Sequence, residues 1–125
     1  MKLDFKDHIN EFGDNLVRLF AFDQHEALLF KQALVDTIID KKESLKVDQL
    51  DFIEAQNCTL TLAIGDEDLG IYSEDKKHFI GALTLASFEK MVTYITPFCN
   101  KESKAYRMLY DVDSLTDFVF TPSGT

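Results

Sequence analysis

Three short runs of alternating apolar and polar residues lie within residues 57–84 and are separated by two compact charged turns. The turns are Gly-Asp-Glu-Asp at 65–68 and Glu-Asp-Lys-Lys at 74–77. Alternation with a period of two, interrupted by short polar turns, is typical of antiparallel strands joined by hairpins. The pattern predicts an antiparallel β-meander over residues 57–84, in which Ile64 lies opposite Leu69.

The second turn of this meander sets which side chains share a face. We expect it to place Ile71 opposite Ile80 on the buried face. The other face would then carry Tyr72, Phe79 and Leu83. A fully solvated face does not need three such side chains, so we expect this second face either to be covered by chain or to be a contact surface.

Apolar residues at helical spacing predict two amphipathic helices, at about 24–40 and 85–96. The first is preceded by Asp23, with Glu26 three residues later, which matches half of a capping box. Pro97 is expected to end the second helix, because the residue before a proline is biased away from the α region. Both helices are expected to pack on the sheet.

The remaining segments predict further strands. Residues 1–15 read as an N-terminal arm or a short helix, and 16–22 as a strand covered on both faces. A short strand is expected near an edge at 50–54 and a last strand at 115–120. Residues 106–110 fit either a strand or a short helix, and we favour the strand. The fold class is therefore α+β, with a mostly antiparallel sheet and two helices in one domain, residues 1–125.

Composition and charge narrow the classes of partner. The chain has 125 residues, 46% of them hydrophobic, and a formal net charge of −9 with 13 Lys and Arg against 22 Asp and Glu. Only two of the basic residues are arginines, Arg18 and Arg107. Nucleic acids and anionic membranes attract proteins through Lys and Arg, so neither is expected as a partner. A basic protein is compatible with the negative electrostatic potential of the chain.

The cysteines and the N-terminus favour a cytoplasmic protein. Two cysteines, Cys58 and Cys99, do not make a disulfide framework, and we expect both as reduced, buried residues. The first residues carry charges throughout and do not resemble a signal peptide. The longest apolar runs fall well short of the roughly 20 residues that span a bilayer.

Motifs for metals are incomplete. An EF-hand loop that began at Asp66 would need Gly and Glu where Ile71 and Lys77 stand. A zinc-protease motif that began at His25 would need a second His where Leu29 stands. We therefore expect no metal and no cofactor.

Catalytic residues are not singled out either. Cys58 and His78 share a parity in the proposed meander and could approach each other, but a core cysteine beside a strand-end histidine is the commoner arrangement. Which of the 22 carboxylates converge is not visible in the sequence. The sequence favours a non-enzymatic protein over an enzyme, without deciding the question.

A surplus of aromatic residues is the one feature that points to a function, because tyrosines are enriched at interface cores. Extra core explains these residues equally well. The leading hypothesis is a protein-interaction module that binds a copy of itself or a basic protein; the alternative is a small-molecule binder or simple hydrolase with a pocket between helices and sheet. The possible interface or pocket residues are Tyr72, Phe79, Leu83, Tyr94, Tyr106 and Tyr110.

Overall fold

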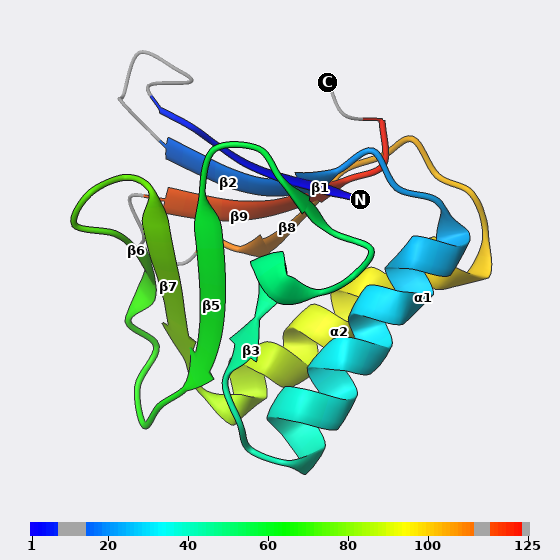
Figure 1. Cartoon of the computed structure of the whole chain (residues 1–125). Helices are drawn as coiled ribbons and strands as arrows, with labels where there is room; N and C mark the ends of the chain where they lie inside the picture. The colour runs from blue at the N-terminus through cyan, green and yellow to red at the C-terminus, as the bar shows by residue number, and fades with distance from the viewer. Residues whose placement is uncertain (8–14, 112–115, 124–125) are drawn as a thin grey trace.

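A computed structural model describes residues 1–7, 15–111 and 116–123. In these residues the chain forms two α-helices and nine strands in two mixed sheets, which confirms the α+β class. The sheets stand at an angle to each other, and the helices pack in the corner between them (Figure 1). No helix of the described residues is long and apolar enough to cross a membrane.

Sheet A brings together strands from both ends of the chain. Its strand order is β4-β1-β2-β9-β8, with β2 parallel to β9 and β9 antiparallel to β8. The central strands are buried on both faces, as predicted for residues 16–22. The strands are β1 (Lys2–Lys6), β2 (Asn15–Phe20), β4 (Glu54–Ala55), β8 (Arg107–Tyr110) and β9 (Thr116–Thr121).

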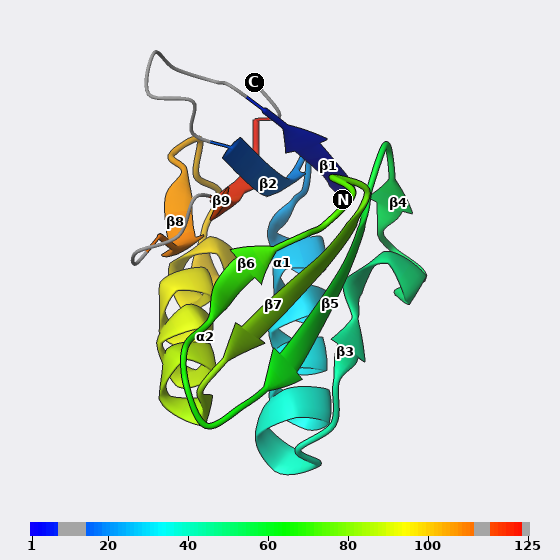
Figure 2. The ribbon, with the colours of Figure 1, turned by 90° about the vertical axis from the view of Figure 1, so that its left-hand side faces the viewer.

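Sheet B has the order β3-β5-β7-β6 and buries one face against the helices. Strand β7 is parallel to β5 and antiparallel to β6. In Figure 2 its other face looks toward the viewer with both helices behind it. The strands are β3 (Leu45–Lys46), β5 (Thr59–Ile64), β6 (Gly70–Tyr72) and β7 (His78–Leu83).

The predicted meander is wrong in its strand order. Strand β7 lies between β5 and β6, so Ile64 does not pair with Leu69. The segment after β5 crosses the end of β7 instead, where the Leu69 amide donates to the Ala82 carbonyl at 2.8 Å. The period-two pattern is the same in the predicted and the observed strand order. In the observed order β7 has a hydrogen-bonded neighbour on each side.

The register of the β6–β7 hairpin differs from the prediction by one residue. Ile71 lies opposite Gly81, and Tyr72 lies opposite Ile80. A slip of one residue exchanges the faces of a strand. Phe79 and Leu83 therefore belong to the core, and Tyr72 shares the outer face with Ile80.

The first predicted helix is confirmed over nearly its whole length. Helix α1 spans Gln24–Ala33 and continues as a π-helical segment, η1, over Leu34–Asp40. Both halves of the capping box are present: Asp23 accepts from the Glu26 amide at 2.9 Å, and Glu26 accepts from the Asp23 amide at 3.4 Å. An aspartate therefore replaces the usual Ser or Thr without loss of the reciprocal pattern.

The second helix is longer than predicted. Helix α2 spans Leu85–Asn100 with Thr84 as its N-cap, and Pro97 lies inside it rather than at its end. Pro97 is exposed, whereas Phe98 is buried against Phe22 and Phe120, with ring centroids 6.1 and 5.1 Å away. Burial of an aromatic ring stabilises the extra turn and offsets the cost of an interior proline.

The remaining connections differ in detail. Lys2–Lys6 form a strand, so of the arm or short helix expected over 1–15 the helix is wrong there; residues 8–14 lie outside the described part of the chain. The short strand expected at 50–54 lies slightly later, as β4, at an edge of sheet A as predicted. A 3-10 turn, Val47–Gln49, precedes it.

Sheet A contains a buried ion pair. The Arg18 Nε donates to Asp4 Oδ1 at 2.7 Å and Nη2 donates to Oδ2 at 3.0 Å, a two-point contact between cross-strand partners. The guanidinium also lies 3.9 Å from the ring centroid of Phe20. Paired hydrogen bonding and aromatic stacking let two charges occupy a buried sheet face.

Candidate functional site

A groove of about 560 Å³ lies between α2 and strand β8; we call it the tyrosine groove. Ser87, Lys90 and Tyr94 line it from α2, at spacings of three and four residues that place them in one row along the helix. The opposite wall is β8 with the residues that flank it. The lining is completed by Asp68, Tyr106, Arg107, Met108, Leu109, Tyr110 and Asp111.

Asp68 fixes one end of the groove by capping α2. Its Oδ1 accepts hydrogen bonds from the Thr84 amide at 2.7 Å, the Thr84 hydroxyl at 3.1 Å and the Ser87 hydroxyl at 2.8 Å. These contacts, the Thr84 amide above all, hold the pKa of Asp68 below its usual value. The acidic turn at 65–68 thus contributes a helix cap.

Arg107 supplies the clearest binding chemistry in the groove. Its guanidinium carbon lies 4.1 Å from the centroid of the Tyr94 ring. Stacking restrains the guanidinium but leaves the N–H groups at its rim available, and no acceptor for them occurs among the described residues. Lys90 lies one helical turn before Tyr94 and adds a second cation.

Three of the six residues named from the sequence lie together in this groove: Tyr94, Tyr106 and Tyr110. Tyr106 is 66% exposed, whereas Tyr110 is buried. Arg107 and Lys90 were not among the site residues predicted from the sequence. The signal for Arg107 was the scarcity of arginine in an acidic chain, whereas Lys90 had no such signal. Of the two arginines, Arg18 is held in the buried ion pair and Arg107 is stacked at a surface groove.

The other three named residues lie elsewhere. Phe79 and Leu83 are in the core. Tyr72 is 44% exposed on the outer face of sheet B, beside its cross-strand partner Ile80, which is 40% exposed. The strands of this face also carry the exposed side chains of His78 and Lys46 and four small residues, Thr59, Thr61, Ala63 and Ala82.

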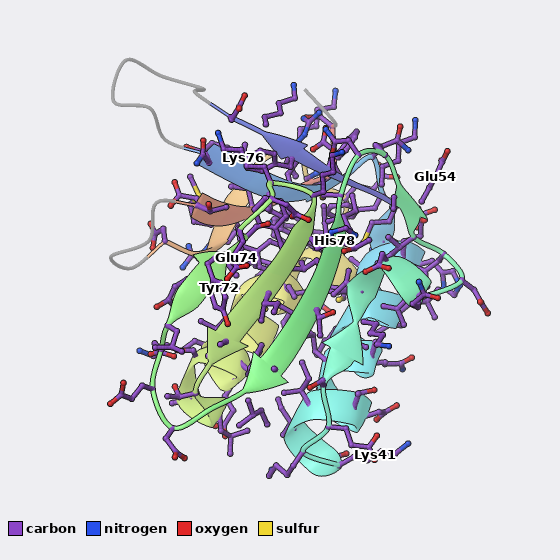
Figure 3. All side chains as sticks on the ribbon, turned by 60° about the vertical axis from the view of Figure 1, so that its left-hand side comes forward. Lys41, Glu54, Tyr72, Glu74, Lys76 and His78 are labelled. Carbon is purple, nitrogen blue, oxygen red and sulfur yellow. The ribbon has the colours of Figure 1, made fainter. Side chains whose placement is uncertain are left out.

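The outer face of sheet B is a second candidate surface. Figure 3 shows Tyr72 and Glu74 projecting at the β6 side of the sheet. The turns at both ends of these strands, 65–68 and 74–77, hold five acidic residues against two lysines. The surface is therefore weakly apolar with acidic margins.

Cys58 and His78 lie on opposite faces of sheet B, although Thr59, the residue after Cys58, is the cross-strand partner of His78. Cys58 is buried in the core, where burial, followed by the nearby Asp4 and Asp48 carboxylates, raises its pKa to about 12. His78 is exposed, and its Nδ1 lies 2.7 Å from Asp75 Oδ2. A thiol with so high a pKa is not a nucleophile at neutral pH.

Asp75 organises the turn before β7. Its Oδ1 accepts from the amides of Lys77 and His78, both at 2.9 Å. These hydrogen bonds, with the His78 side chain as the largest cause, hold the pKa of Asp75 far below its usual range. Within the described residues, no group of three or more His, Cys, Asp or Glu side chains could hold a metal ion.

Comparison of the sequence with protein-family models gives no match, and comparison with curated proteins gives none either.

Proposed function

We propose that the chain is a non-enzymatic protein-interaction module that holds an extended segment of a protein partner in the tyrosine groove. One observation carries this proposal: Tyr94, Tyr106 and Tyr110 line a single groove together with Arg107. Tyrosine and arginine are the residues that most often dominate binding energy at protein interfaces.

The edge of sheet A supports the same function. Strand β8 pairs with β9 and is the last strand of the sheet in the described part of the chain. An extended segment that adds to such an edge gains main-chain hydrogen bonds, while its side chains enter neighbouring pockets. The groove beside β8 supplies such pockets.

Two exposed tyrosines on different surfaces provide a matched test. Tyr106→Ala and Tyr72→Ala remove the same side chain from the groove and from sheet B, respectively. Tagged wild type and both variants are used to capture partners from the native lysate, and captured proteins are quantified by mass spectrometry. We expect Tyr106→Ala to reduce capture of a near-stoichiometric partner about tenfold or more and Tyr72→Ala to leave it unchanged.

Two results contradict the groove as the contact surface. Capture that is insensitive to Tyr106→Ala excludes it. Capture that is lost only with Tyr72→Ala, and that weakens as the salt concentration rises, would instead locate the contact on sheet B. A basic partner would then bind beside the acidic turns.

A small anionic ligand is the second candidate occupant of the same groove. Arg107 and Lys90 present donors, and the groove lies between a helix and a sheet, with a volume typical of ligand pockets. Native mass spectrometry of the protein purified from its own cells distinguishes this case. It would show a bound small molecule that Arg107→Ala removes.

We place the interaction in the cytoplasm. Both cysteines are free thiols, which supports a reducing compartment. The net charge of −9 supports a protein rather than a nucleic acid as the partner.

A further inference from the structure

The guanidinium of Arg107 is restrained over an aromatic ring at the protein surface. Its central carbon lies 4.1 Å from the centroid of the Tyr94 ring, and the residue is exposed. The ring covers one side of the guanidinium, while the N–H groups in its plane remain able to donate. No acceptor for them occurs in residues 1–7, 15–111 and 116–123. Arg107 therefore presents a fork of donors whose orientation is restrained before a ligand binds.

The other arginine of the chain shows what such a fork binds. Arg18 lies over an aromatic ring in the same way, 3.9 Å from the centroid of Phe20, and donates two hydrogen bonds to the carboxylate of Asp4. A planar fork of donors matches the two oxygens of a carboxylate. Arg107 has the stacked ring of this arrangement, and among the described residues it lacks the carboxylate.

The remaining charged groups of the groove leave this position cationic. Asp68 is engaged in the cap at the first turn of α2, about two helical turns before the contact of Arg107. The Thr84 amide above all, and Lys90 to a smaller extent, hold the pKa of Asp68 low, so the charge of Lys90 acts at the cap. Asp111 follows the last residue of β8, at the opposite end of the strand from Arg107.

We propose that the segment held in the tyrosine groove presents an Asp or Glu side chain to Arg107, whose N–H groups donate two hydrogen bonds to the carboxylate. The inference rests on the proposed function, because it names the chemistry of the partner in the same groove. A guanidinium that is already oriented loses little freedom on binding, so more of the interaction energy appears as affinity.

The net charge of the chain makes a preference for acidic residues diagnostic. At long range a chain of charge −9 attracts basic peptides and repels acidic ones. This field is screened beyond about 8 Å at physiological salt, whereas a direct contact is screened much less. Acidic peptides that bind at this salt concentration are therefore selected by a local contact and against the overall field.

A random peptide library tests the inference without knowledge of the partner. Phage that display random peptides are selected on immobilised wild-type protein at physiological salt, and the bound pool is sequenced. We expect Asp or Glu to be enriched at one position of the bound peptides. The selected peptides are expected to bind Arg107→Ala roughly tenfold more weakly than wild type, or worse. Selection on Arg107→Glu is expected to enrich Lys or Arg at that position, because the charge in the groove is reversed.

Three further variants separate the fork from charge in general. Arg107→Lys keeps the charge but not the two parallel donors, so it is expected to recover only a minor part of the affinity. Lys41→Ala removes an exposed cation at the end of η1, away from β8 (Figure 3), and is expected to bind the selected peptides like wild type. Asp111→Asn changes the same groove and is expected to keep the preference for an acid. Circular dichroism checks that every variant is folded.

Each outcome decides the inference. Enrichment of basic residues on wild type overturns it, as does an acidic preference that survives Arg107→Ala, and an Arg107→Lys variant that binds like wild type overturns the two-bond contact. If the selected peptides need Tyr106 but show no preference for an acid, this inference fails and the proposed function stands. If neither the selected peptides nor a captured partner depends on Tyr106, the proposed function fails as well.

Discussion

Sheets A and B differ in how many of their faces are buried. The central strands of sheet A are buried on both faces, so its charged residues there must be paired, as Asp4 and Arg18 are. Sheet B buries one face and presents the other, with small side chains around Tyr72 and Ile80. We therefore propose the β8 edge of sheet A as the binding surface, and the open face of sheet B is its alternative.

The largest effect is expected from breaking the buried pair of sheet A. Asp4→Ala leaves the Arg18 guanidinium buried without its carboxylate, which costs about 3–5 kcal/mol of unfolding free energy. Thr61→Ala, on the outer face of sheet B, is expected to change it by less than about 0.5 kcal/mol. Urea denaturation measures both; similar losses in the two variants would contradict the contrast between the sheets.

A medium effect is expected on the buried face of sheet B. A Cβ added at Gly81 would lie 2.7 Å from Leu62 Cδ2 and 2.8 Å from Ile71 Cδ1, both inside the core. Gly81→Ala is therefore expected to cost about 1–3 kcal/mol, as overpacked cores do.

Gly65→Ala is the control for this change, because its added Cβ meets no atom closer than 3.7 Å. Thermal melts compare the two variants. If Gly81→Ala is as stable as Gly65→Ala, Gly81 does not pack as closely against Leu62 and Ile71 as the structure shows.

A smaller, pH-dependent effect is expected at the groove. Asp68→Asn removes the charge that accepts from Thr84 and Ser87, and we expect a loss of about 1 kcal/mol at neutral pH. The folded-state pKa of Asp68 lies below its unfolded value, so its contribution is complete above the unfolded pKa and is lost as pH falls through the folded pKa.

The difference between wild type and Asp68→Asn should therefore shrink below about pH 4. Urea denaturation across an acidic pH series measures it. A difference that persists unchanged in acid would show that the charge of Asp68 is not what stabilises the cap.

The smallest effect is expected on the open face of sheet B. Ile80→Lys replaces a side chain that is already 40% exposed, so stability should change by less than about 0.5 kcal/mol. A loss of several kcal/mol, measured by chemical denaturation, would mean that this face is covered in solution and that sheet B resembles sheet A after all.

Local patterns in the sequence were enough to predict most of the elements, but not strands β1 and β3. Helical spacing located α1 and α2, and aromatic content indicated that residues 106–110 are a strand. Apolar residues on both parities of 16–22 indicated a strand buried on both faces. These properties depend on residues close together in the chain.

Long-range pairing was not predictable. The alternation in 57–84 is the same whether β6 or β7 lies beside β5, and a one-residue difference in register moved Phe79 and Leu83 from the proposed contact face to the core. The groove depends on α2 packing beside β8, which brings Tyr94 to Arg107, two residues that no local pattern connects. Pro97 does not end α2 as predicted, because the burial of Phe98 outweighs the bias of a proline against helix in the residue before it.

Hydrogen–deuterium exchange of the β8 amides tests the central claim most directly. The exchange of Arg107–Tyr110 is compared with that of the edge strand Gly70–Tyr72 in sheet B, in the free protein and in its complex with the captured partner. The account predicts that the bound partner slows exchange in β8 and leaves β6 unchanged. Slower exchange in β6 with β8 unchanged would contradict it and would assign the contact to sheet B.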